Sequence, residues 1–289
     1  MGLLHKSLSV ELERYDTHEM IHRLEGMGVR AELERDCVPE IKDHSNKIRR
    51  WKWLNSFPLE FIIKLYPRFI KRITYLKSGT GLGFSRIKVP KEFDKNLAYM
   101  LGALRDGSLI NSSGKHWVRI YDAKYSDWLE KIAPIFENLF EIKFHIRYQK
   151  IFNEKYLDIS SKPLFHILKI LVGKKIHKDV PKIIKNAALT IQKSYISGFF
   201  DAEGHVPSAI KKARRITFSQ KDTNSLIFIR ETLKEIGIQC GKISNHTLPI
   251  FGKENMNKFY QQFKILHPEK INRFKTFVEY PSLNKLPRG

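Results

Sequence analysis

The sequence has few cysteines and no long apolar run, and each shortage removes a class of protein. Only Cys37 and Cys240 occur in 289 residues, and they do not form a CxxC pair. A disulfide framework and a cysteine zinc site are therefore excluded, and a reducing, intracellular (cytoplasmic) compartment is expected. No run of eighteen apolar residues is present, so we expect no membrane-spanning helix. The N-terminus turns acidic too early for a signal peptide.

Acidic residues are also scarce relative to basic ones. The chain has 30 Asp and Glu against 52 Lys and Arg, which gives a formal net charge of +22. Such an excess indicates a polyanionic partner, usually nucleic acid. Binding to a membrane surface would need basic amphipathic helices, whereas these basic residues fall mostly in predicted strands and loops. We therefore expect a nucleic-acid partner and no membrane.

One stretch, residues 194–205, predicts an apolar helix that ends in an acid and a glycine, SYISGFFDAEGH. Ile196, Phe199 and Phe200 have helical spacing. Gly198 and Ala202 lie four residues apart, which lets a second helix approach closely. Glu203 then stands at the foot of the helix, where the following glycine favours its end.

A second copy of this pattern occurs at residues 97–108, LAYMLGALRDGS, where Asp106 precedes Gly107. If the two helices pack together, Asp106 and Glu203 come within a few ångströms of each other. Paired carboxylates suit hard divalent cations, which prefer oxygen ligands. The sequence therefore predicts a metal site between the helix feet.

These residues resemble the LAGLIDADG homing endonucleases. SGFFDAEG matches the family motif closely and LGALRDG more loosely, and the likeness extends over roughly residues 90–280. Two motifs in one chain resemble the monomeric, pseudo-symmetric members. The resemblance implies an α+β fold of two αββαββα units that join at the motif helices and form an antiparallel, saddle-shaped sheet for double-stranded DNA.

The repeat continues beyond the motifs. Asp106 and Glu203 are 97 positions apart, and at that offset residues 118–124 (VRIYDAK) fall on residues 215–221 (RITFSQK) without a gap. Each acid is followed eighteen residues later by a lysine, Lys124 or Lys221. Acid, glycine and lysine coincide in the two halves, which favours a true duplication.

The resemblance also assigns catalytic roles. It implies metal-dependent hydrolysis of phosphodiester bonds, with Mg²⁺ or Mn²⁺ held by Asp106 and Glu203. Lys124 and Lys221 occupy the positions of the family's basic-pocket lysines, and Gln220 that of a polar residue that orients water or metal. The first half has Ala123 in the place of Gln220, and Asp122 could replace it in part.

Strand alternation divides the basic residues between two faces. In residues 144–149, His145, Arg147 and Gln149 share one face, while Phe144, Ile146 and Tyr148 are expected to pack on helices. The expected DNA-binding residues come from the strands and from the basic run beside the site: Lys115, Arg119, Tyr121, His145, Arg147, Gln149, Lys211, Arg214, Arg215, Thr217, Ser219 and Lys242.

Composition and motifs divide the chain into three regions: 1–90, 91–188 and 189–289. Residues 1–40 have five basic and nine acidic residues, and residues 41–90 have twelve and two. Helical patterns at 18–26 and 58–65 suggest that the first region is helical. It could be a helix-turn-helix-like DNA-binding module, or an appendage packed on the main body. We expect the two halves to fold without residues 1–75.

The first motif departs from the family pattern. Six positions separate Gly198 from Gly204, whereas five separate Gly102 from Gly107. Either the last turn of the first helix is tighter, or Leu101 faces Gly198 and pushes the helices apart. Arg105, next to Asp106, could also compete with a cation. An endonuclease is the leading interpretation, and a catalytically impaired DNA-binding regulator or an RNA-splicing maturase remains possible.

Overall fold

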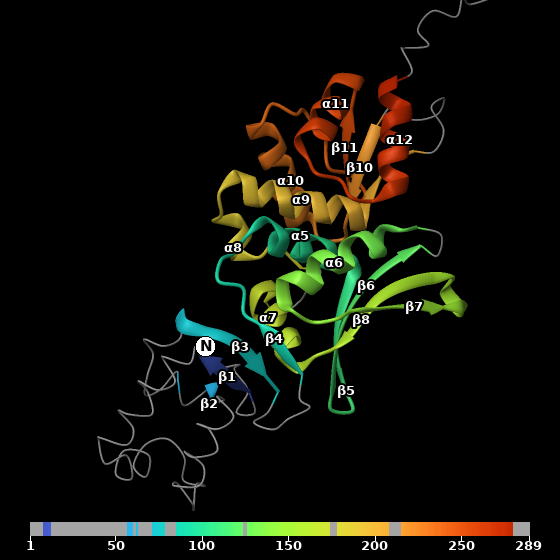
Figure 1. Ribbon diagram of the computed structural model, residues 1–289. Coiled ribbons are helices and arrows are strands. Elements are labelled where there is room, and N and C mark those ends of the chain that lie inside the picture. The colour runs from blue at the N-terminus through green and yellow to red at the C-terminus, as the bar shows by residue number, and fades with distance from the viewer. Residues whose placement is uncertain are drawn as a thin grey trace, which may run out of the picture.

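The computed structural model shows an elongated molecule with two halves and an N-terminal sheet (Figure 1). The structure describes residues 8–12, 57–59, 62, 71–78, 85–123, 126–173, 178–207 and 215–279. The motif helices α5 (Lys95–Ala103) and α9 (Leu189–Glu203) lie side by side in the middle and join the halves.

The first half has the predicted αββαββα order. After α5 and the short 3₁₀ helix η2 (Leu104–Asp106), the chain forms a sheet and two further helices. These elements are β5 (Gly107–Ser112), β6 (Lys115–Ala123), α6 (Trp128–Phe140), β7 (His145–Gln149), β8 (Glu154–Ser160) and α7 (Lys162–Val172). The four strands are antiparallel in the order β5-β6-β8-β7, and α6 and α7 pack against them.

The second half follows this order with one strand fewer and has a smaller sheet. Its elements after α8 (Lys182–Lys185) and α9 are β9 (Gly204–His205), β10 (Arg215–Ser219), α10 (Thr223–Glu235), β11 (Thr247–Phe251), α11 (Lys253–Gln262) and α12 (Pro268–Glu279). The described strands have the order β11-β10-β9 and form no hydrogen-bonded ladder with the first half. The predicted continuous sheet is therefore two separate sheets on either side of the paired helices.

The strand that the αββαββα order places before β11, at residues 242–244, is missing from the described second half. Ser244 forms only an isolated bridge with Thr247, and the two residues between them have positive φ, Asn245 at 46° and His246 at 58°. Two consecutive residues of this kind make the tight turn of a hairpin. Lys242 therefore precedes a turn instead of extending the sheet.

The motif helices cross where two glycines meet the opposite backbone. A Cβ atom on Gly102 would lie 2.1 Å from the carbonyl oxygen of Tyr195, and one on Gly198 would lie 2.1 Å from that of Tyr99. The contacts are reciprocal, as the pseudo-symmetry requires. No side chain of any size fits at either position.

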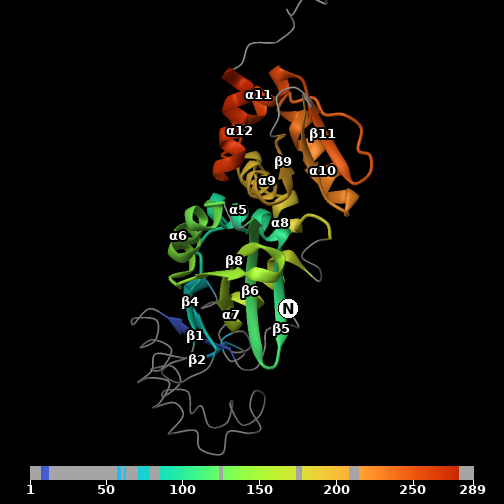
Figure 2. The same cartoon turned by 90° about the vertical axis from the view of Figure 1, so that its right-hand side faces the viewer.

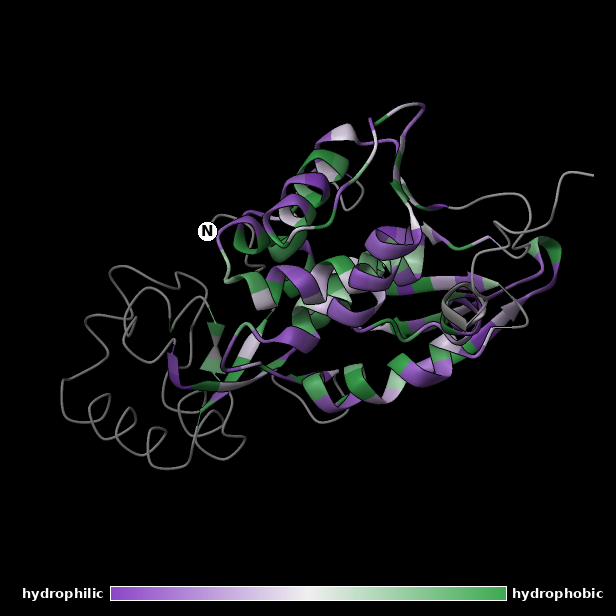
Figure 3. Cartoon of the chain, turned by 90° about the horizontal axis from the view of Figure 1, so that it is seen from above, coloured by the Kyte–Doolittle hydropathy of each residue, from purple (hydrophilic) through white to green (hydrophobic). Residues whose placement is uncertain are grey.

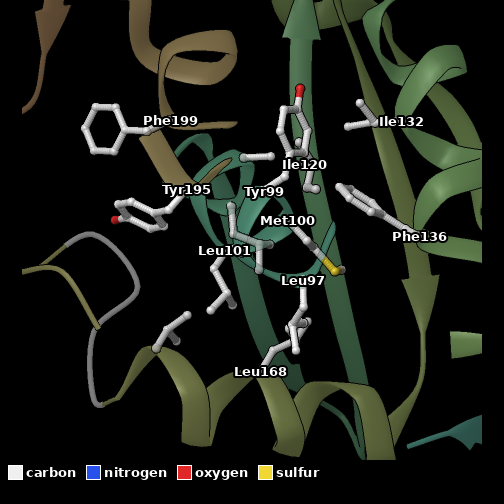
Figure 4. Packing of buried hydrophobic residues seen from close by; sticks show 14 of the residues in the cluster. Leu97, Tyr99, Met100, Leu101, Ile120, Ile132, Phe136, Leu168, Tyr195 and Phe199 are labelled. Carbon is white, nitrogen blue, oxygen red and sulfur yellow. The ribbon is translucent and has the colours of Figure 1, made fainter. Parts of the chain in front are cut away.

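Apolar side chains on both sides of this crossing form one core. Figure 4 shows Leu97 and Met100 of α5 pointing toward Phe136 and Leu168, while Tyr195 and Phe199 extend from α9. Seen from above, hydrophobic and hydrophilic residues alternate along the helices (Figure 3). Figure 2 looks nearly along α9 and shows strands of both halves beside the helix pair.

The described part of residues 1–90 forms mainly a sheet, which the helical patterns in this region did not predict. β1 (Ser9–Leu12), β2 (Phe57–Pro58), β3 (Ile73–Lys77) and β4 (Arg86–Lys88) pair in the antiparallel order β2-β1-β3-β4. Leu59 and Ile62 are helical, and the helix expected at 18–26 lies outside the described residues.

This N-terminal sheet is built into the first half. Val10, Phe57 and Ile87 are fully buried in the same core as α5, and β3 and β4 contact α7. Glu141, at the end of α6, accepts hydrogen bonds from Tyr75 (2.6 Å) and Lys88 (2.8 Å). Removal of residues 1–75 would uncover apolar side chains, which argues against the expectation that the halves fold without them.

In the described part of the chain, no helix is both long and apolar enough to cross a membrane.

Candidate active site and nucleic-acid interface

Both motif helices end at their acids because a strand begins at the next residue. Gly107 opens β5 opposite Ile120, and Gly204 opens β9 opposite Phe218. Their φ angles are −127° and −82°, so neither glycine is needed for a left-handed conformation. Each is needed for space: an added Cβ would lie 2.5 Å from the Arg119 carbonyl oxygen at Gly107, and 2.4 Å from the Phe200 carbonyl oxygen at Gly204.

The first motif helix compensates for its missing residue in its last turn. Residues 104–106 form a 3₁₀ turn, whereas α9 remains α-helical to Glu203. A 3₁₀ helix has three residues per turn and a greater rise per residue, so it covers the distance with one residue fewer. Gly102, and not Leu101, meets α9 at the crossing, and the tighter turn is the correct alternative.

The two acids influence each other electrostatically. Asp106 is exposed, but it stands close to the buried core at the end of the helix. Desolvation there and the charge of Glu203 raise the pKa of Asp106 to about 7. Burial also raises the pKa of Glu203, and Arg105, Lys270 and Gln220 partly oppose that shift. A desolvated carboxylate whose charge is disfavoured by a neighbouring carboxylate suits a cation placed between the two.

The donor set is therefore compatible with a hard divalent cation. It consists of oxygen atoms from two carboxylates, which is the chemistry that Mg²⁺ and Mn²⁺ accept. The described residues contain no group of three or more His, Cys, Asp or Glu that could enclose a metal ion on their own. A metal held here would need further ligands from water or from a bound phosphate.

Arg105 does not occupy the space between the acids. Its guanidinium is 2% exposed and donates to the Asp179 carbonyl oxygen (2.7 Å) and to the Ser225 hydroxyl (3.0 Å). It also lies 3.8 Å from the Asp222 carboxylate. Arg105 therefore ties the first half to α10 and to Asp179, in the segment before α8, and its positive charge also lowers the pKa of Glu203.

The flanking polar residues differ between the halves. The amide of Gln220 lies close enough to Glu203 to lower the pKa of that carboxyl. Lys221 follows it and is exposed, while Lys124 lies outside the described residues. Asp122, the suggested substitute in the first half, has its carboxylate 3.5 Å from His267. Its charge still contributes to the raised pKa of Asp106.

Sequence reasoning missed Lys270, a buried lysine at the start of α12. Its ammonium donates to the carbonyl oxygens of Phe200 (2.8 Å) and Asp201 (2.6 Å), near the end of α9. Burial lowers its pKa to about 8, and the charges of Asp106 and Glu203 act in the opposite direction. The sequence gives no signal for this contact, because Lys270 lies 67 positions after Glu203 in a separate helix.

The second motif contains a further acid, Asp201, which faces away from the acid pair. It is buried and accepts hydrogen bonds from the Tyr99 hydroxyl (2.5 Å) and the Leu266 amide (2.7 Å). The Trp128 indole donates to the same Tyr99 hydroxyl (2.9 Å). This buried network links α5, α6 and α9, so Asp201 serves the interface between the halves.

Most of the predicted DNA-binding residues that the structure describes lie on the open faces of the two sheets. In the first half these are Lys115, Arg119, Tyr121, His145, Arg147 and Gln149, and in the second they are Arg215, Thr217 and Ser219. Val118, Ile120, Ile216 and Phe218, which alternate with them, are buried in the core. Lys211 and Arg214 lie outside the described residues, and Lys242 is exposed in a loop.

Three placements differ from expectation. Ile146 and Tyr148, expected to pack on helices, are 38% and 40% exposed, because β7 is an edge strand that only Phe144 anchors in the core. Thr217 is 8% exposed, since β10 is the central strand of its sheet. Thr217 therefore has little surface for a contact with DNA.

One acid on the open face was not foreseen. Asp158 of β8 is 1% exposed, accepts a hydrogen bond from Arg119 Nε (2.9 Å) and forms an ion pair with Arg147, whose Nε lies 2.9 Å away. The alternation of β8 could have indicated its face, but the pairing of β6, β8 and β7 needed the structure.

Comparison with known proteins identifies the class of this site. Residues 190–264 match the family model of the LAGLIDADG-like domain, which begins in α9 and so includes the second motif. The chain therefore contains a LAGLIDADG-like domain, as the motif predicted. Two packed motif helices in one chain agree with the two-motif type.

The chain is also similar to individual proteins. The chain is 29% identical over 199 residues to the homing endonuclease I-ApeI of Aeropyrum pernix, which covers 64% of this chain and 88% of the relative. The chain is 23% identical over 171 residues to a DNA polymerase of Methanocaldococcus jannaschii, and the aligned region covers 55% of this chain and 10% of that protein. A solved structure of variants of the homing endonuclease I-DmoI superposes with a TM-score of 0.48 at 17% identity, over 62% of this chain and 98% of the other.

Proposed function

We propose that this protein is a site-specific, double-strand DNA homing endonuclease that hydrolyses phosphodiester bonds with a divalent metal. The observation that carries the proposal is the pair Asp106 and Glu203, which stand at the feet of two crossed helices, where the charge of Glu203 helps to raise the pKa of Asp106. The sequence similarity to a curated homing endonuclease supports it.

The residues around the acid pair would divide the work of hydrolysis. Asp106 and Glu203 would hold Mg²⁺ or Mn²⁺, which when bound neutralises phosphate charge and activates water. Gln220 beside Glu203 would orient a water molecule or the carboxylate itself. Lys221, and Lys124 in the other half, would stabilise negative charge on the phosphate.

The basic residues on the open sheet faces would bind the DNA. Lys115, Arg119, Arg147 and Arg215 offer positive charge, and Tyr121, His145, Gln149 and Ser219 offer hydrogen bonds for the major groove. Lys211, Arg214 and Lys242 would add phosphate contacts, while Thr217 would contribute little. One chain would act as a monomer, because its two halves together provide both acids.

We also propose three regions, 1–90, 91–188 and 189–289, with the first one docked on the second. Because the proposed substrate is DNA, the protein would act inside the cell, in the cytoplasm. The helix-turn-helix-like role of residues 1–90 has no support in the described part, which is a sheet packed against α7.

Cleavage of a randomised DNA library tests the proposed activity. The full chain is incubated with the library in Mg²⁺ or Mn²⁺, and the cut ends are sequenced. We expect one consensus site with either metal and no cutting in EDTA. Selective binding without cutting would contradict the endonuclease and favour a DNA-binding regulator, whereas selective binding of RNA would favour a maturase.

The salt dependence of binding tests the proposed interface. Each neutralised phosphate contributes about 0.9 to the slope of log affinity against log salt, so a long interface predicts a steep slope. A slope shallower than about three would contradict binding along both sheets.

A further inference from the structure

The open face of the first-half sheet contains a buried acid among its basic residues. Asp158 lies in the middle of this face, where it pairs across the strands with Arg119 of β6 and His145 of β7. Its carboxylate is nearly inaccessible, with 1% of the residue exposed. A surface that only had to attract phosphates would be more effective without this negative charge.

The carboxylate holds one arginine on each oxygen. Arg119 Nε lies 2.9 Å from Oδ1, and Arg147 Nε lies 2.9 Å from Oδ2. The Arg119 guanidinium also contacts the rings of Trp117 and Tyr156, at 5.3 and 4.9 Å from their centroids. Arg119 is therefore fixed on several sides, while Arg147 remains about half exposed.

Both arginines contact the Asp158 carboxylate through Nε. Because Nε faces Asp158, the two terminal nitrogens of Arg147 have no described partner among the residues that the structure places. A guanidinium with its terminal nitrogens fixed in space forms two parallel hydrogen bonds with O6 and N7 of guanine in the major groove. The entropy cost of ordering the side chain is then met during folding and not during binding.

We propose that Asp158 is a positioning residue that fixes Arg119 and Arg147 to read guanine, and that it increases sequence discrimination at the expense of general affinity for DNA. The proposal rests on the proposed function, since it requires that this sheet face binds DNA. It predicts that loss of the acid has opposite effects on the two kinds of binding.

The first variant, Asp158→Asn, keeps the shape of the side chain and removes its charge. We expect tighter binding to unrelated DNA, because the face loses one negative charge and its two arginines become more mobile. We expect discrimination against a wrong base pair at the contacted positions to decline roughly 10-fold to 100-fold, the value of a bidentate contact.

A second variant tests the fork geometry without touching the buried acid. Arg147→Lys keeps the charge on an exposed residue but cannot form two parallel hydrogen bonds. Arg215→Lys is the matched control, because Arg215 is exposed on the other sheet and has no acidic partner among the described residues. We expect Arg147→Lys to reduce guanine preference and Arg215→Lys to weaken binding about equally for all sequences.

Selection from a randomised duplex library, without divalent metal, measures binding apart from cutting. The base preferences and the affinity for unrelated DNA are compared for the full-length wild type and each variant, together with their melting temperatures. A wild type that selects no site would overturn the proposed function and this inference together. A wild type that selects a site while Asp158→Asn selects it with equal discrimination would overturn this inference alone.

A merely structural role for Asp158 makes a different prediction. It would lower the melting temperature of Asp158→Asn and leave the base preferences unchanged, which would also overturn the inference. If Asp158→Asn does not fold, Arg147→Lys decides the question, since its side chain is largely outside the core. Guanine preference equal to that of the wild type in this variant would then refute the proposal.

Discussion

The two halves of the molecule share a frame but differ at the acid that each contributes. In the first half a 3₁₀ turn ends at Asp106, and Ala123 occupies the position that is equivalent to Gln220 of the second half. In the second half a regular α-helix delivers Glu203, with Gln220 beside it and Lys270 on the last carbonyls of the helix. The backbones are therefore symmetric where the two helices cross, whereas the residues around the two acids differ between the halves.

This difference shows which features a duplicated fold must keep. Gly102 and Gly198 are equivalent because each faces the other helix's backbone, and a change at either would separate the helices. The groups around the acids lie at the edge of the core and have diverged. We therefore expect equal effects at the crossing and unequal effects at the flanking residues.

The largest effect is expected at the crossing. Gly102→Ala and Gly198→Ala each place a methyl group 2.1 Å from a backbone oxygen, and we expect each to cost about 3 kcal/mol or more of stability. Gly114→Ala is the control, because its φ is 73° but nothing lies within 4 Å of the new Cβ. It should cost about 1 kcal/mol. Thermal unfolding that shows all three variants alike would disprove the close crossing.

The next effect separates catalysis from binding. Asp106→Asn and Glu203→Gln should each lower the cleavage rate by at least about 10³-fold, since each removes a proposed metal ligand. Binding to the selected DNA should change little, because it depends on the basic sheet faces. Cleavage and binding assays on the same duplex measure both. Full cleavage by either variant would exclude a mechanism that needs both acids.

A smaller effect tests the asymmetry of the flanking groups. Gln220→Ala should slow cleavage about 10-fold to 100-fold, as expected for a residue that orients a metal ligand. Ala123→Gln, the matched change in the first half, should alter the rate much less, because Asp106 functions there without such a group. Equal effects of the two substitutions on single-turnover rates would contradict the asymmetry.

The smallest effect concerns pH. The pKa of Asp106 is about 7 in the folded protein against an ordinary value of 3.8, so the folded state keeps a proton that the unfolded chain releases. The stability contributed by this proton is complete below pH 3.8 and is lost as the pH rises to about 7. Because the side chain is open to solvent, we expect a modest decline.

Melting temperatures in EDTA between pH 4 and 8 measure this contribution. The decline should be weaker in Asp106→Asn, which has no titrating group at this position. Identical pH profiles for the wild type and the variant would show that Asp106 titrates at its ordinary value.

The motifs predicted much of the frame and part of the site. Acid-glycine endings and small residues at helical spacing indicated the crossed helices and placed Asp106 and Glu203 correctly, because those signals are local. The 3₁₀ turn was one of two alternatives that the missing residue allowed. Only the packing of Gly102 against Tyr195 decided between them.

Contacts between distant segments could not be predicted. Three charged residues show this, since no local sequence pattern sets them apart and their partners come from other elements. They are Lys270, Asp158 and the buried Arg105. The N-terminal sheet was missed for the same reason, since β1 pairs with β3 across more than sixty residues. Charged composition indicated a surface there, whereas the strand pairing buries Val10 and Ile87 in the core.

The contacts of Arg105 have a consequence for how the chain unfolds and how it can be recombined. Arg105 of the first half donates hydrogen bonds to Asp179, in the segment before α8, and to Ser225 of α10. Asp222 in turn accepts a hydrogen bond from the Asp179 amide (2.7 Å). Three segments therefore meet at one buried cation, whose isolation would be costly. Hydrogen exchange should find both halves opening in one cooperative step, and a chimaera that exchanges either half will need Arg105, Asp179 and Asp222 transferred as a set.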